Sequence, residues 1–180
     1  LSGRTIAVQG VGHVGGYLCD HLAEEGATLI ITDIDEALLK DVSARTGAKI
    51  VATDEIYDQY VDIFSPNALG AVINPQTLPR LKAKIVAGGA NNQLSIAEMD
   101  VALRDRGILY APDYVINGGG IINVAAEISG AYSRNWVMGK LNVLIETLGE
   151  VLDEALSRNA PTNEVAEQIA RTRIAAAQSA

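Results

Sequence analysis

A glycine-rich turn ten residues into the chain is the feature that most restricts its fold. The stretch "VQGVGHVGGY" (8–17) places Gly10, Gly12 and Gly15 at G-x-G-x-x-G spacing. The short apolar run "TIAVQG" before it is typical of a buried parallel strand, and the residues after it have helical spacing, with apolar side chains at Val14, Leu18 and Leu22. A strand, a glycine turn and a helix in this order predict a βαβ unit.

The same alternation continues through the first two thirds of the chain. Further strand-like runs are short and apolar, and they cover 28–33, 48–53, 61–66, 83–89 and 108–112. Helical runs separate several of them, one over 35–47 with Asp35 as a possible N-cap and one over 95–107 that opens with a capping-box pattern. This order predicts an α/β fold of the Rossmann type, with a doubly wound parallel sheet.

The pattern changes after residue 112. The segment "NGGGIINVAAEISG" begins glycine-rich and becomes helical, and two further helices are expected over 135–159 and 163–178. We expect residues 1–130 to form the Rossmann domain and 131–180 to form a helical extension of it.

Composition excludes several classes of partner. The net charge is −8 and the pI about 4.7, which disfavours nucleic acid and anionic membrane surfaces. No apolar run reaches the roughly 18 residues that a membrane span requires. Cys19, the single cysteine, has the pattern of a small buried apolar residue and fits a cytoplasmic protein.

An acidic residue ends the second predicted strand, as a dinucleotide-binding fold requires. Asp33 lies 18 positions after Gly15, and a carboxylate there can accept both hydroxyls of an adenine ribose while repelling a 2′-phosphate. No arginine follows it in "DIDEALLK", so the predicted cofactor is NAD rather than NADP. Val14 and Ile34 complete the predicted site beside these residues. His13 is either a phosphate contact or a solvated loop residue.

Three later loops follow strands at the edge where ligands bind in open α/β sheets. They cover 65–74, 88–94 and 111–120. Ala68 permits close backbone access, and the amides of Asn91 and Asn117 suit a carboxamide such as that of nicotinamide. Each asparagine also has an ordinary alternative as a cap or turn residue.

These motifs together resemble a known family. The stretches "VQGVGHVGGYLCDHLAEEGATLIITDID", "DIFSPNALGAVIN", "AKIVAGGANNQL" and "GILYAPDYVINGGGIINVAAE" are similar to the cofactor domain of the Glu/Leu/Phe/Val dehydrogenases, and most to the leucine dehydrogenases within it. The resemblance implies NAD(P)-dependent oxidative deamination of an amino acid to a 2-oxo acid and ammonia. It also implies these roles: Gly10, Gly12 and Gly15 at the pyrophosphate, Asp33 at the ribose, Ala68 near the nicotinamide ribose, Asn91 beside the nicotinamide, and Asn117 at nicotinamide or substrate.

The resemblance also implies what this chain lacks. Family members carry the catalytic lysine, the catalytic aspartate and the substrate-carboxylate pocket in an amino-terminal domain, and none of the five lysines here falls in a predicted cofactor-facing loop. We therefore expect a cofactor-binding chain that is inactive alone and that belongs to a homo-oligomeric enzyme acting on leucine or another apolar amino acid. Four positions depart from the family pattern, namely His13, Asn67, Ala71 and Gly118.

Three other functions are weighed against this one. No tyrosine is followed four residues later by lysine, which excludes the short-chain dehydrogenase pattern. A methyltransferase also uses a glycine turn and an acidic strand end, but it does not predict the loop at Asn117. A nucleotide-sensing regulatory domain without catalysis remains the alternative.

Overall fold

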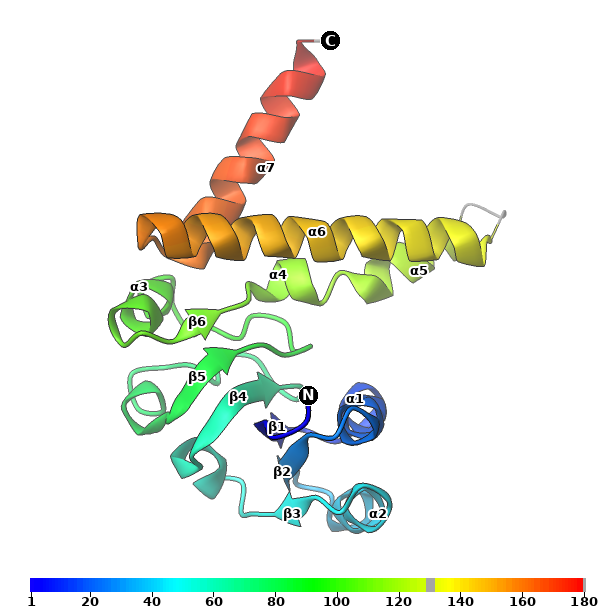
Figure 1. Cartoon of the computed structure of the whole chain (residues 1–180), viewed down its shortest axis with the longest axis vertical. Coiled ribbons are helices and arrows are strands. Elements are labelled where there is room, and N and C mark those ends of the chain that lie inside the picture. Colours follow the sequence, from blue (N-terminus) through cyan, green and yellow to red (C-terminus); the bar gives the residue numbers. More distant parts are fainter. Residues whose placement is uncertain (129–131, 180) are drawn as a thin grey trace.

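The protein is a six-stranded parallel sheet with helices on both faces (Figure 1). The computed structural model describes residues 1–128 and 132–179. The strand order is β3-β2-β1-β4-β5-β6, which is the doubly wound Rossmann order and confirms the predicted fold class. The strands are β1 (Thr5–Gln9), β2 (Thr28–Thr32), β3 (Lys49–Ile50), β4 (Val61–Pro66), β5 (Ala83–Val86) and β6 (Leu109–Tyr110).

Helices alternate with these strands and then follow the last one. They are α1 (His13–Glu24), α2 (Glu36–Thr46), α3 (Glu98–Asp105), α4 (Asp113–Ile116), α5 (Gly119–Ile128), α6 (Arg134–Arg158) and α7 (Thr162–Gln178). Two short 3₁₀ turns that the sequence pattern did not predict, η1 (Glu55–Asp58) and η2 (Leu78–Arg80), flank β4 in the chain.

The helix starts test two capping predictions. The Asp35 carboxylate accepts hydrogen bonds from the Ala37 and Leu38 amides, so the predicted N-cap of α2 is confirmed. The predicted capping box at the start of α3 is wrong, because this helix begins only at Glu98. The backbone before it is engaged elsewhere: the Ser95 amide donates to the Ile73 carbonyl at 2.9 Å, next to a parallel bridge between the two segments.

Apolar clusters fill both faces of the sheet. One contains Phe64, Val86 and Leu103, and the other contains Ile31 and Cys19. The buried residues of helix α1 are Gly15, Gly16 and Cys19. In the apolar stripe of this helix, Val14 is exposed and Leu22 packs, partly buried, against the second cluster. Burial raises the pKa of the Cys19 thiol to about 11, so this cysteine is an inert core residue, as predicted.

The carboxy-terminal helices form a layer beyond the edge strand β6. A third cluster joins Val115 of α4 to α6 and α7 through Val151, Ala155, Val165 and Ala166. Figure 1 shows α6 lying along the outer side of α4 and α5, with α7 projecting away from the sheet. The predicted boundary at residues 130–131 lies outside the described residues. Across residues 1–128 and 132–179, no helix combines the length and apolar character needed to cross a bilayer.

Candidate dinucleotide site

The glycine turn lies at the carboxyl edge of the sheet, between the adjacent strands β1 and β4. Gly10 has a φ of +94°, and a Cβ there would lie 2.7 Å from the Ala68 Cβ. A Cβ on Gly15 would lie 2.0 Å from the Gly10 carbonyl oxygen. Both positions therefore require glycine for the turn itself to close. The turn lies at the topological switch point of the sheet, where ligands bind in this fold.

Gly12 differs from the other two glycines. Its φ is −62°, and a Cβ built there would meet no atom within 4 Å. It is the N-cap of α1, where no side chain accepts a hydrogen bond from the helix and where the first turn carries no acidic residue. The first amides of a helix lack intrahelical partners and carry partial positive charge, so this end of α1 is suited to an anion.

Asp33 lies beside this turn and holds its shape. The carboxylate accepts the Val11 amide at 2.7 Å and the Asp35 amide at 3.0 Å. The next residue, Ile34, is 92% exposed, the highest value among the exposed large apolar side chains of the described residues. His13 and Val14 are also exposed, and the His13 ring makes an edge contact with Tyr17. The predicted residues 10–15, 33 and 34 are therefore brought together.

The loop after β4 contacts the loop after β5 directly. The Asn67 side chain donates to the Ser65 carbonyl at 3.0 Å and accepts from the Gly89 amide at 2.9 Å. A Cβ on Gly88 would lie 2.2 Å from the Pro66 carbonyl oxygen, and one on Gly70 would lie 2.8 Å from the Asn91 carbonyl oxygen. Asn67 and these glycines thus serve the packing of the loops, while Ala68 stays exposed at the edge.

Two of the predicted amides meet. The Asn117 Nδ2 donates to the Asn91 Oδ1 at 2.5 Å, although the residues are 26 positions apart. Asn91 is exposed, and Asn117 is half-buried at the end of α4. The remaining donor and acceptor of this pair are available to a ligand. Asn92, which precedes Gln93, adopts a φ of +52° and turns the loop.

Sequence reasoning missed Gln93 and Asp113. Gln93 is fully buried, and its backbone amide donates to the Asp113 carboxylate at 2.9 Å. The available signal was the aspartate that directly follows Pro112, a common way to start a helix. The partner of that carboxylate could not be read from the sequence, because it lies on another loop.

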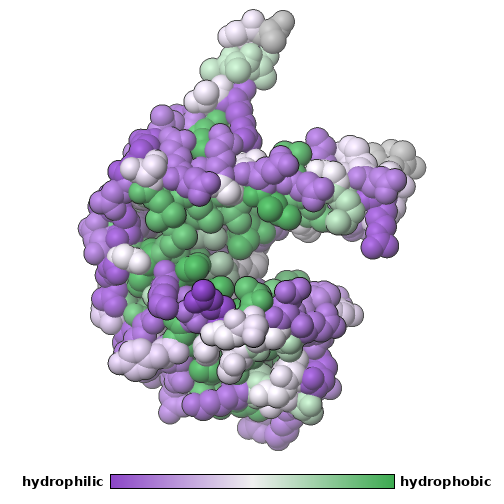
Figure 2. Space-filling model, in the orientation of Figure 1, coloured by the Kyte–Doolittle hydropathy of each residue, from purple (hydrophilic) through white to green (hydrophobic). Residues whose placement is uncertain are grey.

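An apolar hollow opens beside the amide pair. Its volume is about 450 Å³, and the side chains of Val14, Leu18 and Leu22 form one wall while Gly89 and Asn117 lie at another. Figure 2 shows the molecule deeply indented between the part that carries α1 and the arm formed by α5 and α6. The apolar stripe of α1 therefore borders this hollow, and its Leu22 also packs against the sheet cluster.

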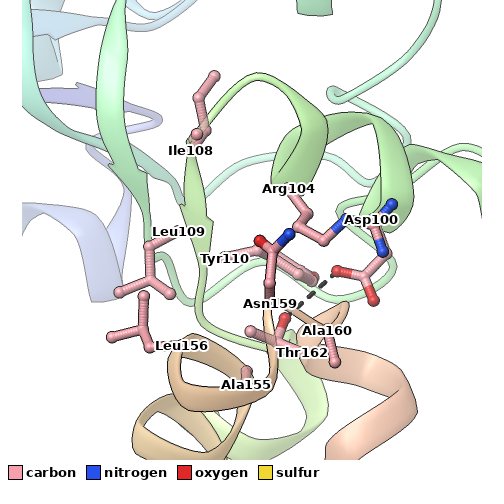
Figure 3. Close-up of a pocket in the computed structure, with 11 residues that line it drawn as sticks. Asp100, Arg104, Ile108, Leu109, Tyr110, Ala155, Leu156, Asn159, Ala160 and Thr162 are labelled. Atoms are coloured by element: carbon pink, nitrogen blue, oxygen red, sulfur yellow. Dashed lines mark hydrogen bonds between the residues drawn. The ribbon is translucent and has the colours of Figure 1, made fainter.

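A smaller hollow of about 130 Å³ lies where α3 and β6 meet the connection between α6 and α7 (Figure 3). Its buried carboxylate, Asp100, accepts a hydrogen bond from the Thr162 hydroxyl at 3.3 Å and from the Asn163 amide at 2.9 Å. Burial raises the pKa of this carboxyl above its usual value. These bonds attach α7 to the sheet domain. The described residues hold no cluster of three metal-ligating side chains.

Comparisons with known proteins agree with this geometry. The family model described as Glutamate/Leucine/Phenylalanine/Valine dehydrogenase matches residues 31–180. The chain is 47% identical over 174 residues to leucine dehydrogenase of Geobacillus stearothermophilus, covering 97% of this chain and 47% of that protein. It is 41% identical over 160 residues to phenylalanine dehydrogenase of Lysinibacillus sphaericus, covering 86% of this chain and 42% of that protein.

The crystal structure of L-tryptophan dehydrogenase from Nostoc punctiforme superimposes with a TM-score of 0.93 at 42% identity, over 97% of this chain and 53% of that one. The chain spans about half the length of the relatives it matches. Fold, motif order and similarity over nearly the whole chain lead to one assignment: the chain belongs to the Glu/Leu/Phe/Val dehydrogenase family.

Proposed function

We propose that this chain is the NAD-binding part of an amino-acid dehydrogenase, with residues 1–130 as the nucleotide-binding domain and residues 131–180 as its helical extension. Leucine dehydrogenases and related amino-acid dehydrogenases of this family are NAD-dependent. The observation that carries the proposal is the uncapped amino end of α1, with open space over Gly12 and the Asp33 carboxylate beside it. A diphosphate next to a ribose diol matches this pair of groups.

The residues present fit the cofactor along its length. The α1 amides would hold the pyrophosphate, Asp33 the adenine ribose, and the exposed side chain of Ile34 would cover the adenine. The Asn91–Asn117 pair would hold the carboxamide of the nicotinamide, and Val14 would contact its ring. When bound, NAD supplies the hydride acceptor, whereas the chain's own residues bind and orient it.

Discrimination against NADP follows from the charge of Asp33. A 2′-phosphate would approach a carboxylate that already accepts two amide hydrogen bonds and has no neighbouring arginine within 34–40. Repulsion between the two anions would not be offset by any cation of this loop. We therefore infer that NAD is the cofactor.

The substrate is an L-amino acid in this proposal, either leucine or another branched-chain or apolar one. Relatives named for leucine, tryptophan and phenylalanine lie at 47%, 43% and 41% identity, which is too narrow a range to choose between them. Deamination also needs a cation that polarises the developing carbonyl. The chain's lysines lie at 40, 49, 82, 84 and 140, outside the loops at the carboxyl edge, so we expect the chain alone not to turn over amino acids.

Isothermal titration calorimetry of the 180-residue chain tests the proposal. NAD⁺ should bind, NADP⁺ should bind at least about tenfold more weakly, and S-adenosylmethionine should not bind. Asp33→Ala should weaken NAD⁺ binding by about tenfold or more, whereas the control Asp35→Ala, which removes a nearby carboxylate that only caps α2, should leave it unchanged.

Absence of heat with NAD⁺ would contradict the proposal. Equal affinity for NAD⁺ and ADP-ribose would favour the alternative, a nucleotide-sensing regulatory domain, because the nicotinamide half would then contribute nothing. Reduction of NAD⁺ by leucine at enzymic rates with this chain alone would refute the expected inactivity.

A further inference from the structure

A buried carboxylate links the two loops that carry the paired amides. Asp113 is only 9% exposed, and it begins the four-residue helix α4. One of its carboxylate oxygens accepts the Gln93 amide at 2.9 Å, and the other accepts the Tyr114 amide at 2.7 Å. The Tyr110 hydroxyl accepts the Asp113 amide at 3.2 Å. The carboxylate therefore joins the loop after β5 to the start of α4.

The same residue reaches the second amide through its backbone. The Asp113 carbonyl accepts the Asn117 amide at 2.9 Å, which fixes the end of α4 where the Asn117 side chain emerges. Asn91 lies two positions before Gln93 on the other loop. One residue thus fixes the backbone near both partners of the Asn91–Asn117 hydrogen bond.

Gln93 completes the arrangement from the loop side. Its side-chain amide donates to the Gly88 carbonyl at 2.7 Å and to the Ala90 carbonyl at 2.9 Å, so the loop from 88 to 93 is closed on itself. Its backbone carbonyl accepts the Ile73 amide at 3.0 Å, which joins this loop to the loop after β4. Among the hydrogen bonds of the described residues, two join this loop to α4 and the residue after it. One is the Asn91–Asn117 bond, and the other is the bond from the Gln93 amide to Asp113.

We propose that Asp113 is a positioning residue: by holding Gln93 and the turn before Asn117, it sets the separation of the Asn91 and Asn117 amides that receive the nicotinamide carboxamide. This inference rests on the proposed function. Asp113 is buried, and in this proposal it acts through its hydrogen bonds to the two loops rather than by touching the cofactor. Its removal should act on the nicotinamide half of the cofactor alone, because the α1 amides and Asp33 belong to other elements.

The test compares two ligands that share the adenosine diphosphate ribose part. The ratio of the dissociation constants of ADP-ribose and NADH measures what the nicotinamide half contributes. In Asp113→Asn, one oxygen acceptor becomes an NH₂ group that faces a backbone amide, so this ratio should fall by about tenfold while the ADP-ribose constant changes less than about twofold.

Two further variants separate positioning from folding. Asp113→Ser keeps a short acceptor beside the Tyr114 amide but does not reach Gln93. This variant should lower the same ratio even if Asp113→Asn folds poorly. The matched control is Asp100→Asn, because Asp100 is also a buried carboxylate that accepts hydrogen bonds at a helix start, but its partners Thr162 and Asn163 belong to α7 and to neither of the two loops. It should change thermal stability without changing the ratio.

The possible outcomes are distinct. If Asp113→Asn and Asp113→Ser lower thermal stability but keep the wild-type ratio, Asp113 serves only the stability of the fold and the inference is overturned. If Asp100→Asn lowers the ratio as much as the Asp113 variants do, the effect is one of general stability and the inference is equally overturned. If the wild type itself binds NADH no better than ADP-ribose, it is the proposed function that fails.

Discussion

Substitution of Gly12 and Gly15 by alanine should separate binding from folding within one turn. At Gly12 the added Cβ meets no atom within 4 Å and the φ of −62° suits any residue. Alanine is a poorer N-cap than glycine by up to about 1 kcal/mol. Losing the freedom of glycine in the unfolded chain returns about 0.4–1 kcal/mol. The net change in the free energy of unfolding should therefore stay below about 1 kcal/mol.

At Gly15 the same methyl group would lie 2.0 Å from the Gly10 carbonyl oxygen. This oxygen belongs to the backbone of a turn whose Gly10 amide bonds the Thr32 carbonyl at 2.8 Å, so it cannot move aside alone. We expect Gly15→Ala to cost about 3 kcal/mol or more. In a chain of this size that lowers Tm by about 6–12 °C.

Gly12→Ala should instead weaken NAD⁺ binding while leaving stability nearly unchanged. The methyl group of Gly12→Ala would enter the space beside the first amides of α1, and displacing a charge-assisted hydrogen bond to phosphate costs about 1.5–3 kcal/mol. NAD⁺ affinity should fall roughly 10- to 100-fold at nearly wild-type Tm. Thermal melts and calorimetry measure both quantities, and Gly149→Ala in α6, where a Cβ also meets nothing within 4 Å, is the control. The reasoning is refuted if Gly12→Ala binds NAD⁺ like the wild type or melts as low as Gly15→Ala.

Three other predictions follow from individual residues. Ala71 adopts a φ of +57°, so Ala71→Gly should raise the free energy of unfolding by about 0.5–1 kcal/mol in urea titrations, and a decrease would contradict this. Burial raises the pKa of Asp100, so the stability contributed by its protonated form is full below the ordinary value of 3.8 and is lost as pH rises through the raised folded value. Urea titrations from pH 3.5 to 7 should therefore show the wild type losing stability relative to Asp100→Asn as pH rises, and parallel profiles would refute this. With a thiol pKa of about 11, folded Cys19 should be alkylated at pH 8 about 100-fold more slowly than in urea, and equal rates would show that it is not buried.

Elements defined by local periodicity were predictable, and those defined by contacts between distant segments were not. The Asp35 cap, the first two strands and helices α6 and α7 followed from spacing and composition close to the observed bounds. The runs predicted over 48–53, 83–89 and 108–112 are strands in fewer residues than predicted, namely Lys49–Ile50, Ala83–Val86 and Leu109–Tyr110. The start of α3 did not, because Ser95 pairs with the distant residue Ile73 and the chain stays extended until that pairing ends. A capping pattern states only what a segment prefers when nothing else binds its backbone.

The apolar stripe of α1 shows a second limit of the sequence. Spacing correctly placed Val14, Leu18 and Leu22 on one face, but it could not say whether that face meets the sheet or a hollow. The fully buried residues of this helix are instead small ones, Gly15, Gly16 and Cys19. Small residues carry little hydrophobic signal, so the face that packs most tightly was the less visible one.

At the candidate site, the residue types were predictable from the sequence. Which of these residues face a ligand and which serve the packing of the loops was not. Asn67 and Asn91 both follow strands of the sheet. The Asn67 side chain is hydrogen-bonded to the Ser65 carbonyl and to the Gly89 amide, whereas the Asn91 side chain is hydrogen-bonded to the side-chain amide of Asn117. The glycines divide in the same way, since Gly15 closes the turn and Gly12 faces open space.

Replacing a polar residue whose hydrogen-bonding groups are satisfied within the protein lowers the free energy of unfolding. Replacing one that keeps free groups at the carboxyl edge lowers the affinity for the ligand. The site therefore consists of a few groups that face the ligand and a larger set of residues, here called the frame, whose hydrogen bonds are made within the protein. Asp113 belongs to that frame, which is why its effect should appear in how the nicotinamide half is held rather than in whether the nucleotide binds.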